Sequence, residues 1–363
     1  MYKYKIFEAF DNEIENIWKE LEINNDNIFY TFDWHKAWNN NIGKFNSKIL
    51  IILIEKFNND GKTIIIFPLI IKKYFFCSVL EWSGYPFSDL NSPITNKNID
   101  SEDIEYFITI LEEIRNNIQI NIFIAINQLN LDFIKILNQK KKSKIFDSSI
   151  NYFYNFNSED FNRRKSGELK YVIKDIERQK RRIRRKITFI NNPLDINMRK
   201  KIFHKLIKFK YEQYERNNSW NFLKKKNYVE FLNSQVQSQN VHISCLSLDH
   251  EVIAAHMGYL YKDNFFYILP AYDYRYKNFS VGNILLLELF QDLKKNCNKF
   301  DFTIGGESYK SKWTNNKSET SNLIFYLDVK GYIFYLNILL KKKIKKTNLI
   351  SLYLKSIYHL FKK

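Results

Sequence analysis

Residues 271–290 combine a strand end, a loop and a helix start whose backbone could bind a pyrophosphate. We expect a strand to end at Ala271 and a helix to begin near Gly282. The first amides of a helix have no partner inside it and lie at the positive end of its dipole, so they attract anions. A residue as small as glycine lets the backbone approach the oxygens closely. The same pattern is also typical of a plain helix start without a ligand.

The first half of the sequence predicts an α/β unit. Thr31 is a candidate N-cap, and the run Asn58-Asn-Asp-Gly61 is a hairpin signal. A turn-rich loop is expected at 83–93. The expected helices are 14–21, 31–40 and 103–116, and the expected strands are 47–55, 62–71, 79–82 and 120–126.

The second half repeats this order of helices and strands. Three consecutive strands are separated by short polar turns, and Gly305-Gly306 indicates a further turn. The expected helices are 197–214, 226–239 and 282–296, and the expected strands are 241–248, 252–261, 265–271, 299–303 and 323–329. Helices followed by an antiparallel meander indicate an α+β fold with a mixed, mostly antiparallel sheet. Neither a dinucleotide-binding glycine motif nor a P-loop motif occurs.

The composition indicates a folded intracellular protein. The chain has 363 residues, which suggests two domains, and only three widely spaced cysteines, which fits a reducing compartment. The longest apolar runs, 64–71 and 332–340, are shorter than the ~18–20 residues that a bilayer requires. We therefore expect a cytoplasmic protein that could touch the inner membrane surface. The six His and three Cys lack the spacing of a metal site, so no metal is expected.

The net charge of +18 is concentrated in two stretches. Residues 161–190 contain 12 basic and 3 acidic residues, and residues 330–363 contain 9 Lys and no acid, so each stretch carries +9. The first stretch predicts a basic helix, 163–186, which is either a solvated helix face or a landing surface for a phosphate-bearing partner. The second is either a helix packed on the body or a segment that lies on an anionic leaflet.

Two segments resemble a known superfamily. The run Lys277-Asn-Phe-Ser-Val-Gly282 resembles the acyl-CoA-binding loop of GNAT acyltransferases, with Lys in place of the usual Gln or Arg and Ser in place of the first Gly. Residues 300–313, with Glu307, Tyr309, Lys310 and Trp313, resemble the signature of the CelD-like branch, which is often associated with polysaccharide production and is similar to the FemABX aminoacyl transferases. The resemblance covers roughly residues 25–330.

The resemblance implies two tandem GNAT-like modules, each with a mixed, mostly antiparallel sheet flanked by helices. We expect a degenerate module at 1–155, an acyl-CoA-binding module at 156–330 and a basic tail at 331–363. The implied donor is acyl-CoA, with acetyl-CoA favoured. The residues expected to bind it are Lys277, Asn278, Phe279, Ser280, Val281, Gly282 and Asn283.

GNAT chemistry is direct acyl transfer from a thioester to an amine, which needs a base and a proton source for the thiolate. Asp273 could act on the amine or simply bond local amides, and His256 could be a base or a buried core residue. Glu307 and Lys310 could contact the substrates or form a structural ion pair, and Tyr309 could protonate the thiolate or pack. Trp34 and Asp89 of the first half could line the acceptor site, although packing is the stronger expectation for Trp34.

These observations predict an N-acyltransferase that acts on the amino group of an amino sugar or of a polysaccharide or cell-envelope precursor. The first alternative is a FemABX-like transfer from aminoacyl-tRNA, for which the basic helix would bind RNA. The second is a catalytically inactive scaffold at the membrane surface. The expected partners are a small-molecule or glycan amine, an anionic membrane surface that contacts 331–363 and, less favoured, tRNA; DNA is not expected.

Overall fold

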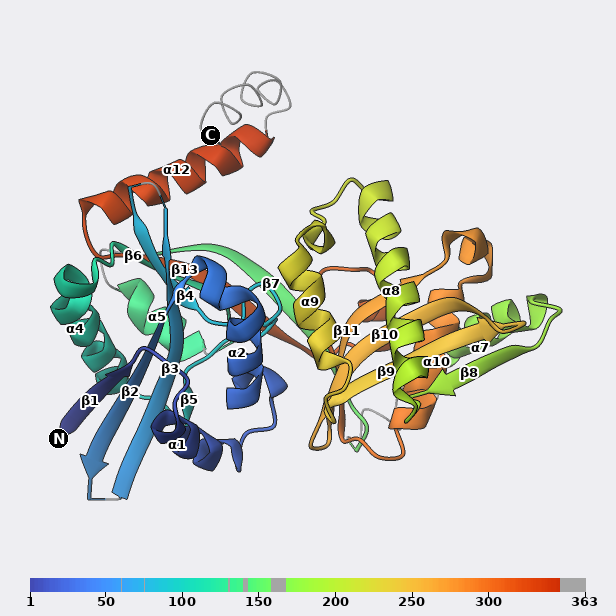
Figure 1. Ribbon diagram of the computed structural model, residues 1–363, viewed down its shortest axis with the longest axis horizontal. Helices are drawn as coiled ribbons and strands as arrows, with labels where there is room; N and C mark the ends of the chain where they lie inside the picture. Colours follow the sequence, from blue (N-terminus) through green and yellow to red (C-terminus); the bar gives the residue numbers. More distant parts are fainter. Residues whose placement is uncertain (60, 75, 130, 140–142, 158–167, 347–363) are drawn as a thin grey trace.

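The computed structural model describes residues 1–59, 61–74, 76–129, 131–139, 143–157 and 168–346. Within these residues the strands form one mixed 13-stranded sheet with helices on both faces (Figure 1). The strand order is β1-β2-β3-β4-β6-β13-β7-β12-β11-β10-β9-β8, with β5 paired to β3. The predicted fold class is confirmed.

The first half is built on a long hairpin whose side chains alternate between two apolar layers. β2 (Lys48–Asn58) pairs with β3 (Gly61–Lys73), and Asn58 lies opposite Gly61 as the turn signal predicts. Leu50 and Ile52 face the layer of α4 (Ser101–Ile118) and α5 (Leu131–Gln139), whereas Ile51 and Leu53 face α1 (Asn12–Glu22). This alternation follows from the two-residue period of a strand. The other strands of this half are β1 (Tyr2–Phe7), β4 (Ser78–Trp82), β5 (Ile94–Thr95) and β6 (Ile122–Gln128).

The first half also contains α2 (Phe32–Trp38), which begins where the sequence predicts it. The Thr31 side chain accepts a hydrogen bond from the Trp34 amide, as an N-cap does. The short helical segments around α2 are η1 (Ile28–Tyr30), η2 (Asn39–Gly43) and α3 (Lys44–Asn46).

The second half surrounds a meander of β9 (Val241–Leu248), β10 (Glu251–Tyr261) and β11 (Asn264–Tyr272), with β8 (Ile187–Asn191) at its edge. The turn between β9 and β10 is tight because Asp249 and His250 both have positive φ, 46° and 67°. One face carries α8 (Ile196–Arg216) and α9 (Lys226–Gln235), together with apolar residues of the first half. The other face carries α7 (Glu168–Arg182) and α10 (Val281–Leu293).

Two strands are exchanged between the halves. β7 (Ser143–Asn155) pairs with β12 (Lys299–Ile304) of the second half, and β13 (Lys317–Tyr326) is inserted between β6 and β7. The sheet is therefore continuous across the predicted division between 155 and 156, although that division itself stays a prediction. The predicted strand 323–329 starts earlier, at Lys317, and Val329 instead begins helix α12 (Val329–Lys346).

β11 and β12 run parallel but separate at their carboxyl ends. Only Asn264–Phe266 pair with Lys299–Asp301, and both strands then continue without pairing to each other. The loop before α10 follows β11, and the Gly305-Gly306 turn follows β12. The two segments that the sequence singled out therefore begin at the diverging carboxyl ends of these two parallel strands.

Three short segments complete the structure: η3 (Phe222–Lys224), η4 (Tyr274–Phe279) and α11 (Lys310–Trp313). The sequence did not predict β1, β7, β8 or α5. No helix in the described part of the chain is both long enough and apolar enough to span a bilayer. The same residues contain no His, Cys, Asp and Glu group arranged for a metal ion.

Candidate active site

The carboxyl end of β12 and the turn that follows it hold the backbone in a strained conformation. Thr303 has φ of 57°, a value that is unusual for a β-branched residue. Its amide donates to the Asp301 carboxylate at 2.8 Å. Asp301 is fully buried, pairs with Lys299 at 2.9 Å and accepts a hydrogen bond from the Asn151 amide of β7. Strain of this kind persists only where the surroundings impose it, and such residues cluster at functional sites.

Lys310 fixes the same turn from the other side. Its ammonium group donates to the carbonyls of Thr303 (3.3 Å) and Ile304 (2.8 Å) and pairs with Glu307 at 3.0 Å. The Lys310 side chain is 4% exposed, whereas that of Glu307 is 58% exposed. Gly305 has φ of 139°, and a Cβ there would lie 2.2 Å from the Glu307 carboxylate. The ammonium of Lys310 is thus occupied in shaping the turn, as the structural alternative predicted.

Asp89 brings a carboxylate from the first half to this turn. Burial raises the pKa of the Asp89 carboxyl to about 6, and the charges of Asp301 and Glu307 act in the same direction. The neighbouring Thr303 hydroxyl and the Lys310 charge oppose the shift. A carboxylate with this pKa is matched to accepting a proton near neutral pH.

Trp34 anchors the loop that carries Asp89 and does not line a surface. Its indole Nε1 donates to the Ser88 hydroxyl at 2.8 Å, and its ring packs edge-on against Phe29 and Tyr259. The residue is 3% exposed. The Trp34 ring thus lies in the core between the halves, and its predicted contact with the acceptor would require that core to open.

Two residues of α8 that the sequence did not single out lie near the same cluster. The Lys210 ammonium donates to the Pro270 carbonyl at 3.1 Å and lies over the Tyr214 ring at 5.2 Å. Burial lowers the pKa of Lys210 to about 8, and the nearby Glu307 carboxylate limits the decrease. Burial also raises the pKa of Tyr214 to about 12, with Asp89 and Glu307 adding to the shift. Residue type does not distinguish Lys210 in the sequence, since α8 contains several other lysines.

Asp273 is engaged by its own loop. Its carboxylate caps η4 by accepting from the Arg275 amide and forms an ion pair with the Arg275 guanidinium at 2.6 Å. The hydrogen bonds from Arg275 lower the pKa of Asp273. These contacts agree with the alternative of a local turn residue, and they make the carboxylate a weaker base than Asp89.

His256 is enclosed in the core. It is fully buried, its ring stacks on Tyr267 at 4.4 Å between centroids, and it contacts Phe265 on the face that α10 covers. Burial holds its pKa well below the usual value. Neither ring nitrogen has a hydrogen-bond partner among the described residues. The prediction of His256 as a base is corrected, because no acceptor can reach a side chain without exposed surface.

Tyr309 lies beside the turn and is half-buried against the core under α10. Burial and the Glu307 carboxylate raise the pKa of its hydroxyl, which stays protonated at neutral pH. The structure therefore gathers four of the predicted residues, Asp89, Glu307, Tyr309 and Lys310, at the carboxyl end of β12.

The loop before α10 offers two backbone donors. The amides of Val281 and Gly282 have no acceptor within the described part of the chain, whereas the Ser280 amide donates to the Lys277 carbonyl at 3.2 Å. Ser280 has φ of 52°, which turns the chain into the helix. Gly282 leaves room for the Tyr272 ring, which a Cβ would meet at 3.2 Å. Two free amides at a helix start fit a phosphate group.

Positive side chains border this loop. Lys277 donates to the Tyr274 hydroxyl at 3.0 Å, and the Arg216 guanidinium lies 3.8 Å from the centre of the Tyr274 ring. Of the other predicted contact residues, Asn278 and Asn283 are exposed, Phe279 is half-buried and the Val281 side chain is in the core. Val281 can therefore contribute only its backbone.

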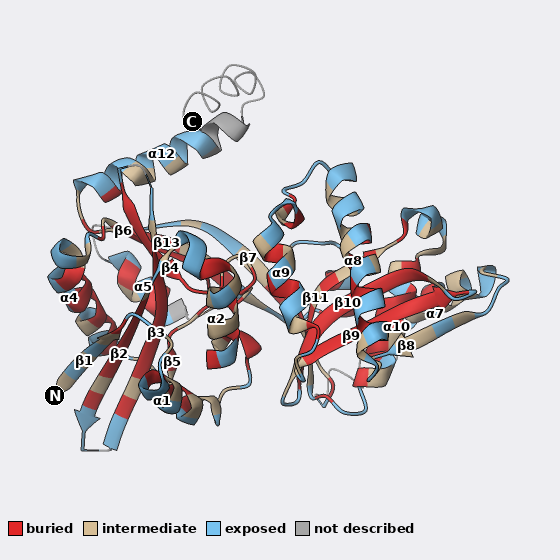
Figure 2. Cartoon of the chain, viewed as in Figure 1, coloured by how far each residue is buried: buried red, intermediate tan, exposed pale blue. Residues whose placement is uncertain are grey.

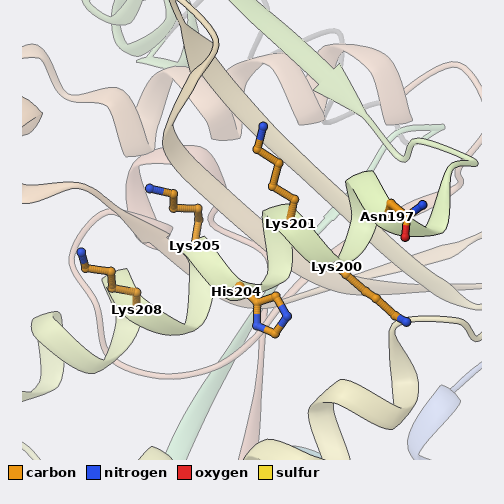
Figure 3. Close-up of a pocket in the computed structure, with 6 residues that line it drawn as sticks. All are labelled: Asn197, Lys200, Lys201, His204, Lys205 and Lys208. Carbon is orange, nitrogen blue, oxygen red and sulfur yellow. The ribbon is translucent and has the colours of Figure 1, made fainter.

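A second basic surface lies on the solvent side of α8. Figure 3 shows its side chains extending from successive turns of the helix around a shallow depression. They are Asn197, Lys200, Lys201, His204, Lys205 and Lys208. Of the predicted basic helix, residues 163–167 lie outside the described part of the chain. In the remainder, Lys180 pairs with Glu288 of α10, and Arg178 pairs with Asp175 at 2.5 Å.

Comparison with known protein families gives one match that covers most of the second half. Residues 172–311 match the acetyltransferase (GNAT) domain. This region is therefore similar to GNAT acetyltransferase domains. The match includes the loop before α10 and the turn after β12, and it supports an acyltransferase. No curated protein sequence matches the chain.

Solved structures with the same fold span both halves. FemX aligns with a TM-score of 0.57 and 9% identity over 92% of this chain and 99% of its own. The C-terminal domain of a putative lysylphosphatidylglycerol synthetase from Agrobacterium fabrum gives 0.56 and 10% over 89% and 94%. A tandem GNAT protein from the clavulanic acid biosynthesis pathway gives 0.51 and 4% over 90% and 99%. At these identities the likeness concerns the fold alone.

Proposed function

We propose that this protein transfers an acyl group from acyl-CoA to an amino group at the carboxyl end of β12. One observation supports the proposal: the first half brings the Asp89 carboxyl, whose burial raises its pKa to about 6, to the strained carboxyl end of β12, within the residues that match the GNAT domain. The free amides of Val281 and Gly282 would hold the donor pyrophosphate.

In the proposed reaction Asp89 accepts a proton from the acceptor ammonium group, and the free amine attacks the thioester carbonyl. The C–S bond breaks as the C–N bond forms, and the thiolate takes a proton from an acid. The second proton that the attacking nitrogen loses as the amide forms restores that acid. Tyr309, whose hydroxyl stays protonated at neutral pH, is the candidate for this acid. No covalent enzyme intermediate is needed, so the three cysteines, which are all buried, have no role in the step.

The acceptor is proposed to be an amino sugar or a polysaccharide or cell-envelope precursor. This part rests on the resemblance of residues 300–313 to the CelD-like branch. A screen of thiol release with acetyl-CoA and longer acyl-CoAs against amino sugars tests it. Calorimetry with the same acyl-CoAs tests the donor alone, and no binding of any of them would remove acyl-CoA from the proposal.

Aminoacyl-tRNA is the second candidate donor. The lysine face of α8 supports it, because four lysines and no acid line the depression in Figure 3. The fold shared with FemX and with the lysylphosphatidylglycerol synthetase domain supports it as well. Neutralised phosphates release counterions, so tRNA binding should weaken steeply as salt rises.

A gel shift with bulk tRNA at low and moderate salt separates the two donors. The variant with Lys201, Lys205 and Lys208 changed to Ala should lose tRNA binding if this candidate is right. Exposed lysines of the first half, Lys3, Lys44 and Lys135, supply a control variant with the same loss of charge. Equal binding by both variants would count against tRNA at α8.

The GNAT match disfavours the inactive scaffold, and thiol release by the purified chain would exclude it.

A further inference from the structure

Helix α12 is apolar on two opposite faces. Gly331, Phe334, Tyr335 and Ile338 face the sheet, where Phe334, Tyr335 and Ile338 pack against β4, β6 and β13. A Cβ on Gly331 would lie 2.0 Å from the Asn121 carbonyl, which shows how closely the helix approaches the body. Figure 1 shows that α12 lies along the first half, away from the second half.

The opposite face of α12 carries apolar residues, and Figure 2 colours much of this helix as exposed. Val329, Ile333 and Leu340 are 73%, 46% and 57% exposed. The positions 329, 333, 336 and 340 follow the three- and four-residue spacing of one helix face. Within residues 329–341 of α12, whose burial is described, the exposed apolar residues are Val329, Tyr332, Ile333, Leu336, Leu339 and Leu340.

A second exposed apolar segment lies beside the sheet-facing side of α12. Tyr74 and Phe76, from the connection between β3 and β4, are both exposed, and their ring centroids lie 5.2 and 6.1 Å from that of Phe334. The exposed face of α12 alone gathers several apolar residues on one helix, which indicates an interaction surface rather than scattered surface residues.

The charge of this region indicates what the surface binds. Lys330 and Lys341 are exposed on α12, and residues 330–363 contain nine lysines and no acidic residue. A second copy of the chain would bring two such stretches together, so repulsion disfavours self-association. A helix with an apolar face and neighbouring lysines is typical of binding at an anionic bilayer surface.

We propose that the exposed apolar face of α12 docks the protein on an anionic lipid surface. The apolar side chains enter the interface, and the lysines contact the lipid phosphates. This proposal is independent of the proposed acyl transfer. Helix α12 lies along the first half of the molecule, and none of its residues belongs to the candidate active site.

Co-sedimentation of the full chain with vesicles tests the proposal. Vesicles of 70% phosphatidylcholine and 30% phosphatidylglycerol should bind the protein at least tenfold more strongly than pure phosphatidylcholine vesicles. The substitutions Ile333→Ser, Leu336→Ser and Leu340→Ser together should lower binding to the anionic vesicles at least tenfold. All three side chains are exposed, so the thermal unfolding of the variant should match that of the wild type.

The matched control replaces exposed apolar residues of the second half. The double variant Leu194→Ser with Trp220→Ser should leave vesicle binding unchanged. Both residues are exposed, but they lie in loops of the second half and not on α12. The proposal is overturned if the wild type binds neither vesicle, if it binds both equally, or if the triple variant binds like the wild type. A stable dimer that the triple substitution dissociates would also overturn it.

Discussion

The Asp89 carboxyl should control the pH dependence of the reaction. A base must be deprotonated to act, so kcat/KM should rise with pH and level off above the Asp89 pKa of about 6. Asp89→Asn should lower kcat by roughly 10²- to 10⁴-fold and remove this acidic limb. Stopped assays between pH 5 and 8 measure both effects. A variant that retains the limb would show that another group titrates.

The same carboxyl should reduce stability above pH 6. Its pKa is about 6 in the folded chain and near 3.8 when unfolded, so the folded state holds the proton more tightly. The unfavourable contribution therefore grows as pH rises from about 4 to about 6, up to roughly 3 kcal/mol. Asp89→Asn should raise the melting temperature at pH 8 and have little effect at pH 4, as thermal unfolding at both values would show. An equal effect at the two values would contradict the assignment.

The sequence indicates which residues could take part in the reaction, but it does not indicate which neighbours surround each of them in the fold. It named Asp89, Glu307, Tyr309 and Lys310, and the structure gathers them. It could not show that Arg275 occupies Asp273 or that His256 has no exposed surface, because both depend on neighbours from other turns and strands. Lys210 could not be predicted from the sequence, because only its burial distinguishes it from the other lysines of α8.

Among the elements, the turn after β12 should be the least tolerant of substitution. Gly305→Ala places a Cβ 2.2 Å from the Glu307 carboxylate at φ of 139°, so we expect a loss of about 2 kcal/mol or more in stability together with reduced activity. Denaturant unfolding measures the loss. Gly306→Ala is the control, since a Cβ there meets no atom within 4 Å and should change stability by less than about 0.5 kcal/mol.

The close contact between α12 and the start of β6 should also be sensitive to substitution. Gly331→Ala would place a methyl group 2.0 Å from the Asn121 carbonyl, and a rigid backbone atom cannot move aside easily. We expect α12 to shift from the sheet and stability to fall by roughly 1–3 kcal/mol. Hydrogen exchange measures this effect, and the α12 amides of Gly331→Ala should be less protected than those of the wild type. Stronger protection in the variant would contradict the prediction.

Helices and strands with a clear pattern of apolar residues could be predicted from the sequence, whereas the exchanged strands could not. The hairpin of β2 and β3 follows from its apolar runs and turn residues, and the α2 start follows from Thr31. β7 contains many polar residues and is half-buried over most of its length, so it lacks the apolar run of a central strand. Its place in the sheet depends on β12 and β13, which come much later in the chain.

For the whole molecule, the exchange of β7 and β13 should make the two halves unfold together. Each half contains a strand that completes the sheet of the other, and a shared core joins them. We expect one transition in denaturant by both circular dichroism and tryptophan fluorescence, and no stable fold for residues 1–155 expressed alone. Two separate transitions, or a folded fragment, would show that the halves are independent.

The position of β13 also has a consequence for synthesis of the chain. A ribosome completes β6 long before it reaches residue 317, and until then β6 has no neighbour on the side that β13 later occupies. An emerging polypeptide would thus carry an open strand edge through most of translation, and such edges invite pairing with other chains. Cells that make this protein should need holdase chaperones at the ribosome, and truncated products that end before residue 317 should aggregate.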